Sequence, residues 1–398
     1  MSHHTATRRP AVPGRAARKA LLLAAAALPL GAAAGPTIEF GSGSNLNITY
    51  SLQGWLQGRG FTSSDNGARS WDMFLRRNRL TFSGQYNDQI GFYAQLEASG
   101  DSRGGADDRS VFFRDAYISF DYSDELRFIA GRFKNAFSRE NLEACLEPLT
   151  MDRAEVLSYT PFAGTRDTGV AVWGNLFNAR VQYRLMVADG REGSYVPKDS
   201  PRVTGRVHVS LWDPEFNYGY LGTYLGTQKV LTIGAAYDTQ KDVAWANYLS
   251  RADVKSYKAT TLDAFMELPH ATGVYTLSAA TFKYDTGGAF GQSPDPELNA
   301  NSDLKGWYLK AGYMLPSKVG PGRLQLFGRH ERLDYAVKTG IAQYYDNTWN
   351  SLGAHYYFDG QRIKVSAELA KVRFDTPHPL NQALRDYRQA TLGVQLIF

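Results

Sequence analysis

The sequence predicts an all-β fold: a transmembrane antiparallel β-barrel of about 16 strands. Three observations predict it. Apolar and polar residues alternate along most of the chain, as they do in a strand with two different faces. Tight links between these segments alternate with long polar ones. Finally, mean hydropathy is only -0.37, and no apolar run approaches the roughly 20 residues that a membrane-spanning helix needs.

Residues 1–34 are typical of a secretory signal peptide. The basic stretch ATRRPAVPGRAARK is followed by the apolar stretch ALLLAAAALPL and by small residues. Arg8-Arg9 also allows a twin-arginine signal, but Pro10 and Ala11 follow where that signal needs hydrophobic residues, which favours the general export route. We place cleavage after Ala34. This leaves a short N-terminal segment, 35–45, and a barrel over 46–398.

Cleavage changes the charge balance of the chain. Five of the 44 basic residues lie in 1–34, so the mature chain has 39 basic and 39 acidic residues. The pI near 9.0 is therefore a property of the precursor and gives no argument for nucleic-acid binding. A preference for anions has to come from local clustering of charge. The single cysteine, Cys145, excludes an internal disulfide.

The alternation is clear in 89–99, where Ile90, Phe92 and Leu96 share one face and Gln95 and Glu97 the other. A soluble sandwich also buries one face, so segment number and link length must separate the two folds. Each segment has about the ten residues that a tilted membrane strand needs. The predicted strands are 46–57, 73–86, 89–99, 111–122, 125–134, 166–175, 176–188, 202–211, 229–239, 258–268, 271–284, 305–315, 322–335, 347–358, 361–373 and 387–398.

The lengths of the links distinguish the two ends of the barrel. Short turns on one side and long loops on the other are typical of outer-membrane barrels. The stretch 212–228 is too long for a tight turn and has no assigned place in this pattern. The last strand ends at Phe398, a terminal aromatic similar to the signal that the barrel-assembly machinery reads. The predicted long links are 58–72, 100–110, 135–165, 189–201, 240–257, 285–304, 336–346 and 374–386.

The stretch FLRRNRLTFSGQY, at 74–86, indicates what the barrel encloses. If Leu80 and Phe82 face lipid, Arg77 and Arg79 face inward, and Arg76 lies on the other parity near the loop end. A charged residue facing lipid at the midplane costs about 2–4 kcal/mol. Parity therefore also assigns Arg180, Arg184 and Arg206 to a water-filled lumen. We expect much of this charge to pair with acids such as Glu97 and Asp115.

The link 135–165 is far longer than a usual connection, which indicates a functional loop. Its apolar residues, among them Phe137, Leu142 and Leu157, need a surface to pack on, and folding into the barrel supplies one. The loop also carries both signs of charge: it includes Arg139, Arg153 and five acids, and a sixth acid, Asp167, follows at its end. We expect it to form a constriction.

Four stretches in order resemble the phosphate-selective porin O and P family: FLRRNRLTFSG at 74–84, FRDAYISF at 113–120, GRFKNAFSRE at 131–140, and EPLTMDRAEV with RDTGV across 147–170. The resemblance implies a bacterial outer-membrane porin of sixteen strands, a homotrimer, with an inward-folded third loop and cations that bind anions at a constriction. The candidate pore residues are Arg77, Arg79, Arg132, Lys134, Arg139, Arg153, Arg166, Arg180 and Arg184.

The expected function is passive ion transport through an anion channel, in which small anionic or polar solutes, phosphate or other oxyanions among them, cross the outer-membrane lipid. The six acids in and directly after the loop and the neutral mature chain leave the solute open. Two alternatives remain: a barrel enzyme, or a structural sheath around a partner protein. The five mature histidines lie in different segments without a recognisable serine–histidine neighbourhood, so no catalytic residue is expected. The sequence predicts no cofactor and no metal site.

Overall fold

The computed structural model describes residues 35–41, 43–60, 69–98, 110–159, 165–193, 196–247, 249–289, 303–336, 343–381 and 384–398. The predicted signal peptide, 1–34, lies outside these residues, and so does most of the predicted link 100–110. Within the described residues no helix is long and apolar enough to cross a membrane.

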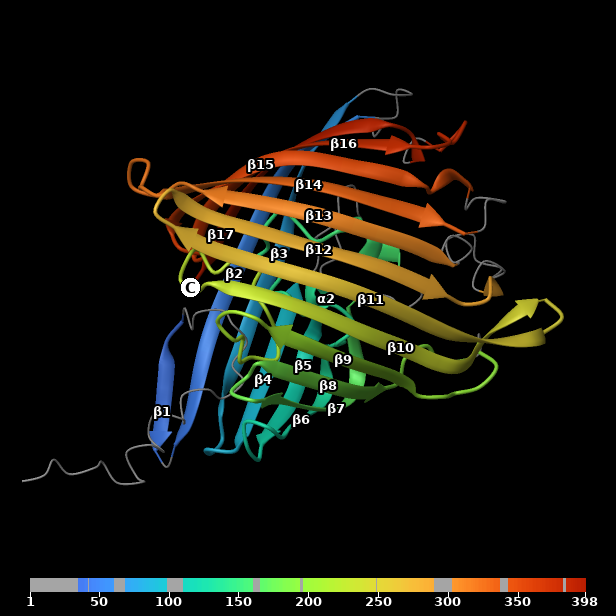
Figure 1. Cartoon of the computed structure of the whole chain (residues 1–398), viewed down its shortest axis with the longest axis horizontal. Helices are drawn as coiled ribbons and strands as arrows, with labels where there is room; N and C mark the ends of the chain where they lie inside the picture. Colours follow the sequence, from blue (N-terminus) through green and yellow to red (C-terminus); the bar gives the residue numbers. More distant parts are fainter. Residues whose placement is uncertain are drawn as a thin grey trace, which may run out of the picture.

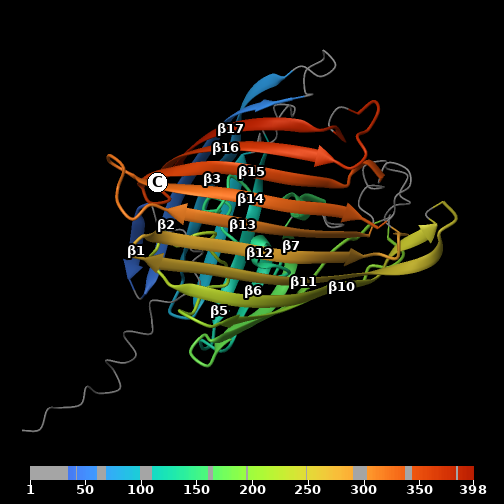
Figure 2. The ribbon, with the colours of Figure 1, turned by 45° about the horizontal axis from the view of Figure 1, so that its top comes forward.

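Sixteen strands of the described chain close into an antiparallel barrel, as the sequence predicts (Figures 1 and 2). Each strand pairs with its neighbours in the sequence, and the last strand pairs with β2 to close the ring. The strands are β2 (Ser44–Arg59), β3 (Ser70–Gln85), β4 (Ile90–Ala98), β5 (Val111–Asp121), β6 (Arg127–Lys134), β7 (Arg166–Leu176), β8 (Val181–Ala188), β9 (Arg202–Ser210), β10 (Val230–Asn247), β11 (Ala252–His270), β12 (Gly273–Asp285), β13 (Leu304–Met314), β14 (Arg323–Tyr335), β15 (Asn347–Asp359), β16 (Ile363–Phe374) and β17 (Tyr387–Ile397).

A further strand, β1 (Thr37–Gly41), lies in the predicted N-terminal segment and pairs with the first residues of β2. Ile48 donates to the Pro36 carbonyl at 3.2 Å, and Tyr50 and Phe398 exchange two backbone hydrogen bonds of 2.8 Å. Strands β1 and β17 therefore lie end to end along one edge of β2. The terminal Phe398 sits where they meet.

The two faces of the wall are the reverse of those in a soluble protein. Inward polar side chains are buried, such as Glu97 at 1% exposure, while outward apolar side chains are exposed, such as Leu352 at 73% and Leu369 at 70%. Apolar residues on the outside suit contact with lipid, and a closed sheet leaves few backbone groups unpaired there. The register along β17 follows this alternation up to its last residues.

Two local predictions are wrong. Residues 240–257 are not a loop, because β10 and β11 continue as a hairpin that projects beyond the barrel (Figure 1), with Asn247 opposite Ala252. The predicted strand 176–188 begins only at Val181. Phe177, Asn178 and Ala179 have φ values of 55°, 56° and 59°, which place them in a turn.

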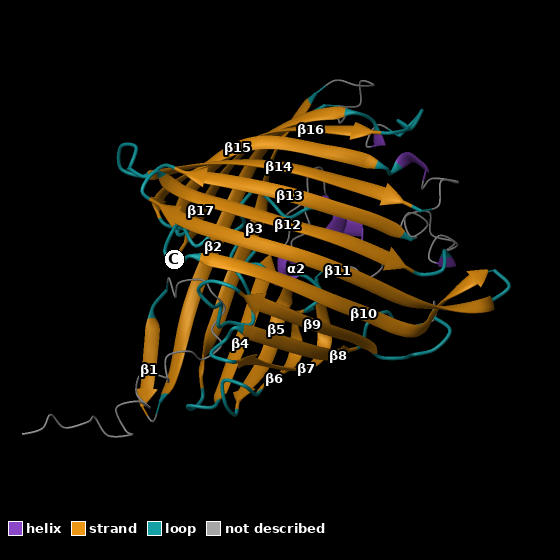
Figure 3. Cartoon of the chain, in the orientation of Figure 1, coloured by secondary structure: helices purple, strands orange, loops and turns teal. Residues whose placement is uncertain are grey.

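Two connections fold into the ring. The first, between β6 and β7, contains the short helix α2 (Arg139–Leu142) and the 3-10 helix η1 (Glu155–Tyr159), which lie within the barrel in Figure 3. The Ser138 hydroxyl caps α2 by accepting from the Asn141 backbone N–H. The second is 211–229, between β9 and β10, the stretch for which the sequence offers no place. Together they shape the lumen.

Candidate pore constriction

The loop between β6 and β7 is held against inward side chains of the opposite wall. Each bond below joins this loop to a different strand, so the loop crosses the lumen. The Arg139 N–H donates to Asp263 of β11 (3.1 Å), Glu140 pairs with Lys310 of β13, the Val156 N–H donates to Glu331 of β14 (3.2 Å), Lys364 of β16 donates to the Leu146 carbonyl (2.8 Å), and Arg76 of β3 donates to Asp152 (2.7 Å).

One side of this loop is packed solid against the barrel. Phe137, Val156 and Leu157 lie in a buried cluster with aromatic side chains of the wall, including Tyr284 and Tyr308. These aromatic rings take the place that water would occupy in an open lumen. The loop therefore closes the lumen along β10 to β14 and leaves the opposite side as the only candidate passage among the described residues.

The segment 211–229 enters from the short-turn end and pairs with the same loop. Ala144 donates to the Tyr220 carbonyl at 2.8 Å, and Gly222 donates to the Glu147 carbonyl at 3.0 Å. The Arg139 guanidinium donates to both carboxylate oxygens of Glu215 at 2.8 Å. Burial acts to raise the pKa of Glu215, but Arg139 outweighs it and holds the pKa at about 2. This segment fills the lumen below the loop.

Two cavities formed by described residues lie on the open side. The larger, about 560 Å³, is at the long-loop end and is bounded by β2, β3, β5, β6, β7 and β14 to β17. The smaller, about 160 Å³, is at the short-turn end beside β2 to β7. Arg166 lines both cavities. It therefore lies where the two cavities adjoin, and the two cavities together are called the candidate route.

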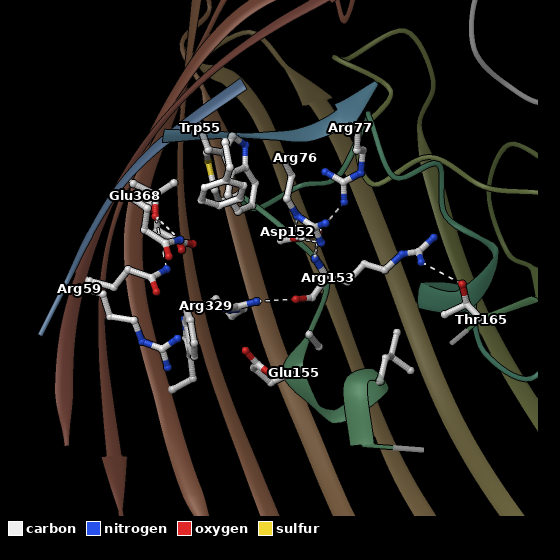
Figure 4. A pocket seen from close by; sticks show the side chains of 18 of the residues that line it. Trp55, Arg59, Arg76, Arg77, Asp152, Arg153, Glu155, Thr165, Arg329 and Glu368 are labelled. Atoms are coloured by element: carbon white, nitrogen blue, oxygen red, sulfur yellow. Dashed lines mark hydrogen bonds and ion pairs between the residues drawn. The ribbon is translucent and has the colours of Figure 1, made fainter. Parts of the chain in front are cut away.

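The larger cavity is strongly cationic. Among the described residues that line it, three are acids, Asp152, Glu155 and Glu368, and eight are arginines. Arg76 and Arg77 reach from one strand toward Asp152, and Arg153 extends away toward Thr165 (Figure 4). An excess of five positive charges surrounds this space. The arginines are Arg59, Arg76, Arg77, Arg114, Arg132, Arg153, Arg166 and Arg329.

Two β-bulges bring arginines into this cavity. In β3 the register shifts so that Gln53 faces Arg77 and Gly54 faces Leu75, which makes Arg76 the extra residue and turns it inward beside Arg77. Arg76 and Arg77 donate to Asp152 at 2.7 and 2.8 Å. Burial acts to raise the pKa of Asp152, but the two arginines outweigh it and hold the pKa well below its usual range.

The second bulge lies in β5. Gln95 faces Asp115 and Leu96 faces Phe113, so Arg114 is the extra residue. Its guanidinium hydrogen-bonds to Glu97, which also accepts from Arg79 at 2.8 Å. The expected pairing of wall arginines with Glu97 and Asp115 is therefore present, since Arg166 contacts Asp115 at 3.1 Å.

Six of the nine candidate residues line the route. Arg77, Arg132, Arg153 and Arg166 line the larger cavity, and Arg79, Lys134 and again Arg166 line the smaller one. Arg132 is exposed and shares the outward alternation of Phe128 and Ala130. It therefore lines the larger cavity although, unlike the other lining arginines, it does not face the lumen. The other five are partly or fully buried.

The structure corrects the remaining three. Arg180 lies in the exposed turn before β8 and donates to the carbonyl of Trp212, because the strand starts one residue later. Arg184 does face inward, but it is covered by the segment 211–229 and donates to Tyr220 at 2.8 Å. Arg139 donates to both carboxylate oxygens of Glu215. All three lie outside the residues that line the two cavities.

Sequence reasoning missed four of the lining arginines. Arg76 and Arg114 are bulge residues, and strict alternation assigns a bulge residue to the wrong face or leaves it ambiguous. Arg59 and Arg329 follow the inward alternation of their strands, so parity could have found them. Neither lies near the family-like stretches that directed the search.

Two serine–histidine contacts are present that the sequence did not predict. His208 lies 3.0 Å from Ser210 Oγ, and His355 Nδ1 lies 2.7 Å from Ser366 Oγ. Both histidines are buried, and neither pair belongs to the residues that line the two cavities. These contacts therefore satisfy buried polar groups within the wall.

The family model described as phosphate-selective porin O and P matches residues 57–398 of this chain. The chain belongs to that porin family. Its short turns accordingly face the periplasm and its long loops the outside of the cell, the orientation of outer-membrane barrels. The smaller cavity of this porin is thus periplasmic and the larger one external.

Solved porin structures share this fold at low sequence identity. The anion-selective porin from Comamonas acidovorans matches with a TM-score of 0.57 at 12% identity, over 89% of this chain and all of the other. OmpF of Salmonella typhi in complex with daunomycin gives 0.59 at 14%, over 91% and 100%. The outer-membrane channel DcaP of Acinetobacter baumannii gives 0.56 at 13%, over 92% and 100%. Among curated proteins, nothing matches this chain.

Proposed function

We propose that this porin lets small hydrophilic solutes diffuse passively across the outer membrane and that it prefers anions. The observation that carries the proposal is the surplus of arginine around the external cavity, eight against three acids among the described lining residues. A cleft lined by one sign of charge raises the local concentration of counter-ions. Anions would therefore be enriched where the route narrows.

The side chains along the route fit oxyanions. Arginine presents several donors in a rigid fork, which matches carboxylate and phosphate oxygens and replaces their lost hydration. Arg77, Arg153 and Arg166 follow one another from the external cavity toward the junction. The Comamonas protein with the same fold is an anion-selective porin, which supports the same preference here.

We also infer a homotrimer in the outer membrane. OmpT of Vibrio cholerae, whose solved structure includes a trimer form, shares the fold with a TM-score of 0.54 at 11% identity, over 89% of this chain and 99% of the other. Phe398 ends the last strand at the periplasmic end, where the barrel-assembly machinery would bind it. Chemical cross-linking of the detergent-solubilised protein should give a band of three subunits; a monomer alone would contradict the trimer.

Planar bilayers test the function. The purified protein should give stepwise conductance, and the reversal potential in a KCl gradient should indicate that chloride permeates better than potassium. Arg77→Glu together with Arg79→Glu should shift the reversal potential toward potassium selectivity. Arg332→Gln is the matched control, because Arg332 pairs with Asp375 away from both cavities. It should leave selectivity unchanged.

The outcomes separate the alternatives. Potassium selectivity of the unaltered protein would refute the anion preference and keep the channel. No conductance at all would favour the enzyme or the sheath around a partner protein. We infer passive diffusion and no catalysis, because the charged residues line the two cavities and the serine–histidine pairs do not.

A further inference from the structure

Cys145 lies on the proposed route. It lines the periplasmic cavity together with Arg79, Lys134, Glu147 and Arg166. The cysteine is the free thiol of the described chain and is 5% exposed. Because Arg166 also lines the external cavity, the sulfur stands next to the junction between the two spaces.

The backbone on both sides of Cys145 is fixed. Lys134 Nζ donates to the Leu142 and Glu143 carbonyls at 3.0 and 2.7 Å, and Arg153 donates to the Glu143 carbonyl at 2.9 Å. On the other side, Lys364 Nζ donates to the Leu146 carbonyl at 2.8 Å, and the Gly222 N–H donates to the Glu147 carbonyl at 3.0 Å. These bonds hold the thiol toward the cavity, so its position does not depend on a mobile loop.

A second observation points to a ligand at this place. Arg79 is 3% exposed, and its Nε is bound to Glu97. Its Nη2 has no hydrogen-bond partner within the part of the chain that the structure describes. A buried guanidinium nitrogen with an open donor is costly unless an anion or water fills the position. Arg79 and Cys145 line the same cavity, so an anion bound by Arg79 is held beside the sulfur.

The surroundings of the sulfur favour its reactive form. Burial acts to raise the pKa of the Cys145 thiol, but nearby cations outweigh it and hold the pKa well below its usual range; they are Arg153, Arg166, Arg79 and Lys134. The thiolate is the form that attacks disulfides and metals.

We propose that Cys145 is a modification site at which small anionic disulfides, entering through the pore, form a mixed disulfide that blocks the channel. The inference rests on the proposed channel function. The cations bind the acidic groups of the incoming molecule and bring its sulfur atoms to the thiolate. Closure would be reversible, because a second thiol can release the blocking group.

The step is a thiol–disulfide exchange. The Cys145 thiolate attacks one sulfur of R–S–S–R, the Cys145–S–S–R bond forms as the original S–S bond breaks, and R–S⁻ leaves with the electron pair. The disulfide itself is the oxidant. The product replaces the charge of the thiolate by the acidic groups of R and fills part of a cavity of about 160 Å³. Disulfides persist outside the cytosol, where this protein lies.

Labelling and conductance should be measured with a matched pair of methanethiosulfonate reagents of similar size, one sulfonated and one carrying trimethylammonium. Mass spectrometry of the native protein should find one label per chain at Cys145, and the sulfonated reagent should react on the order of 10-fold faster. In bilayers it should reduce the conductance, and dithiothreitol should restore it. The conductance of the C145S variant should be the same before and after the reagent is added.

Arg79→Gln tests the anion position without leaving a buried charge unpaired, because Glu97 keeps its contact with Arg114. This variant should lose most of the preference for the sulfonated reagent, whereas Arg332→Gln should keep it. The proposal is overturned if native protein is labelled only after denaturation, if both reagents react equally fast, or if complete labelling leaves the conductance unchanged. A channel that is chloride-selective but is not labelled would refute only this inference. A channel that is labelled but potassium-selective would refute only the anion preference of the pore.

Discussion

At the level of single residues, the charge of the pore depends on how each acid is compensated. Asp152 stands between Arg76 and Arg77 and neutralises part of their charge. Both arginines point into the external cavity because a bulge breaks the alternation of β3. We therefore expect the selectivity of this porin to depend on the arginines that remain after such pairing and not on the number of arginines alone.

Replacing Asp152 by Asn should increase the anion preference. The substitution removes the charge that compensates Arg76 and Arg77 and keeps the size of the side chain. We expect the chloride-to-potassium permeability ratio to rise about two- to threefold in a KCl gradient. Asp375→Asn is the control, since Asp375 is half exposed and pairs with Arg332. A ratio that falls in Asp152→Asn would mean that the two arginines do not face the permeating ions.

The pore should also respond to pH through Glu147. Burial raises the pKa of this loop carboxyl to about 7, against the charges of Lys364 and Lys134. Glu147 is therefore mostly neutral one unit below that value and mostly charged one unit above it. Since it lines the periplasmic cavity, anion preference should fall as the pH rises from about 6 to about 8. Selectivity that stays constant over this range would contradict the assignment.

The variant Glu147→Gln isolates this effect. The part of the pH dependence that Glu147 contributes should be absent from this variant, because the amide exchanges no proton. The same carboxyl also affects stability. Because the pKa of Glu147 is higher in the folded chain than in the unfolded chain, the folded chain binds more protons, and stability is lost as the pH rises from about 4.5 to 7. Reversal potentials at pH 6 and pH 8, in both proteins, are the measurement.

At the level of elements, the lumen is shaped by two connections that hold each other. The loop between β6 and β7 and the segment 211–229 share backbone hydrogen bonds through Tyr220 and Gly222, and the buried pair of Arg139 and Glu215 joins them. Tyr224 adds a further hydrogen bond to Glu215. Neither connection would have these hydrogen bonds and this ion pair without the other. Their mutual contacts explain why a long link on the periplasmic side can fold inward.

A double-mutant cycle tests this clamp. Glu215→Gln or Arg139→Gln alone leaves one buried charge without its partner and should destabilise the barrel by about 3–5 kcal/mol. Removing both should cost clearly less than the sum of the two. The loss of the heat-resistant folded form on gels, followed with temperature, reports the change. Additive losses would show that the two side chains do not act on each other.

At the level of the whole molecule, this barrel has a wide circumference, but the open part of its lumen is narrow. The aromatic cluster around Phe137 and Tyr308 fills one half, and the segment 211–229 fills the lumen below the loop. What remains is a route along β2 to β7 that carries the arginines. Conductance should therefore be far below that of an empty sixteen-stranded barrel.

Replacing 214–226 by a short Gly-Ser turn should widen the periplasmic half of the route. We expect single-channel conductance in KCl to increase roughly twofold, because the filled space beneath the loop becomes accessible to water. Shortening the projecting hairpin between β10 and β11 at 247–252 is the control, since that tip lies away from both cavities. An unchanged conductance after removal of 214–226 would mean that the narrowest point lies elsewhere.

Much of the architecture was accessible from the chain alone. All sixteen barrel strands lie within a few residues of their predicted positions over most of their length, and Arg77, Arg79 and Arg166 are among the residues that line the two cavities. The errors have physical causes. Arg76 and Arg114 depend on bulges, Arg180 on a turn with positive φ, and Arg139 and Arg184 on partners in 211–229.

The sequence by itself determined the closed barrel, its membrane-facing surface and its family. Alternation is a local property, since each residue of a strand chooses its face through the two-residue repeat of the backbone. The tertiary structure alone decided which arginines reach the pore, because bulges and inward-folded connections are selected by partners far away in the chain. Asp152 meets β3 and Glu215 meets Arg139 only after the ring has closed, so the residues adjacent to them in the sequence do not specify these contacts.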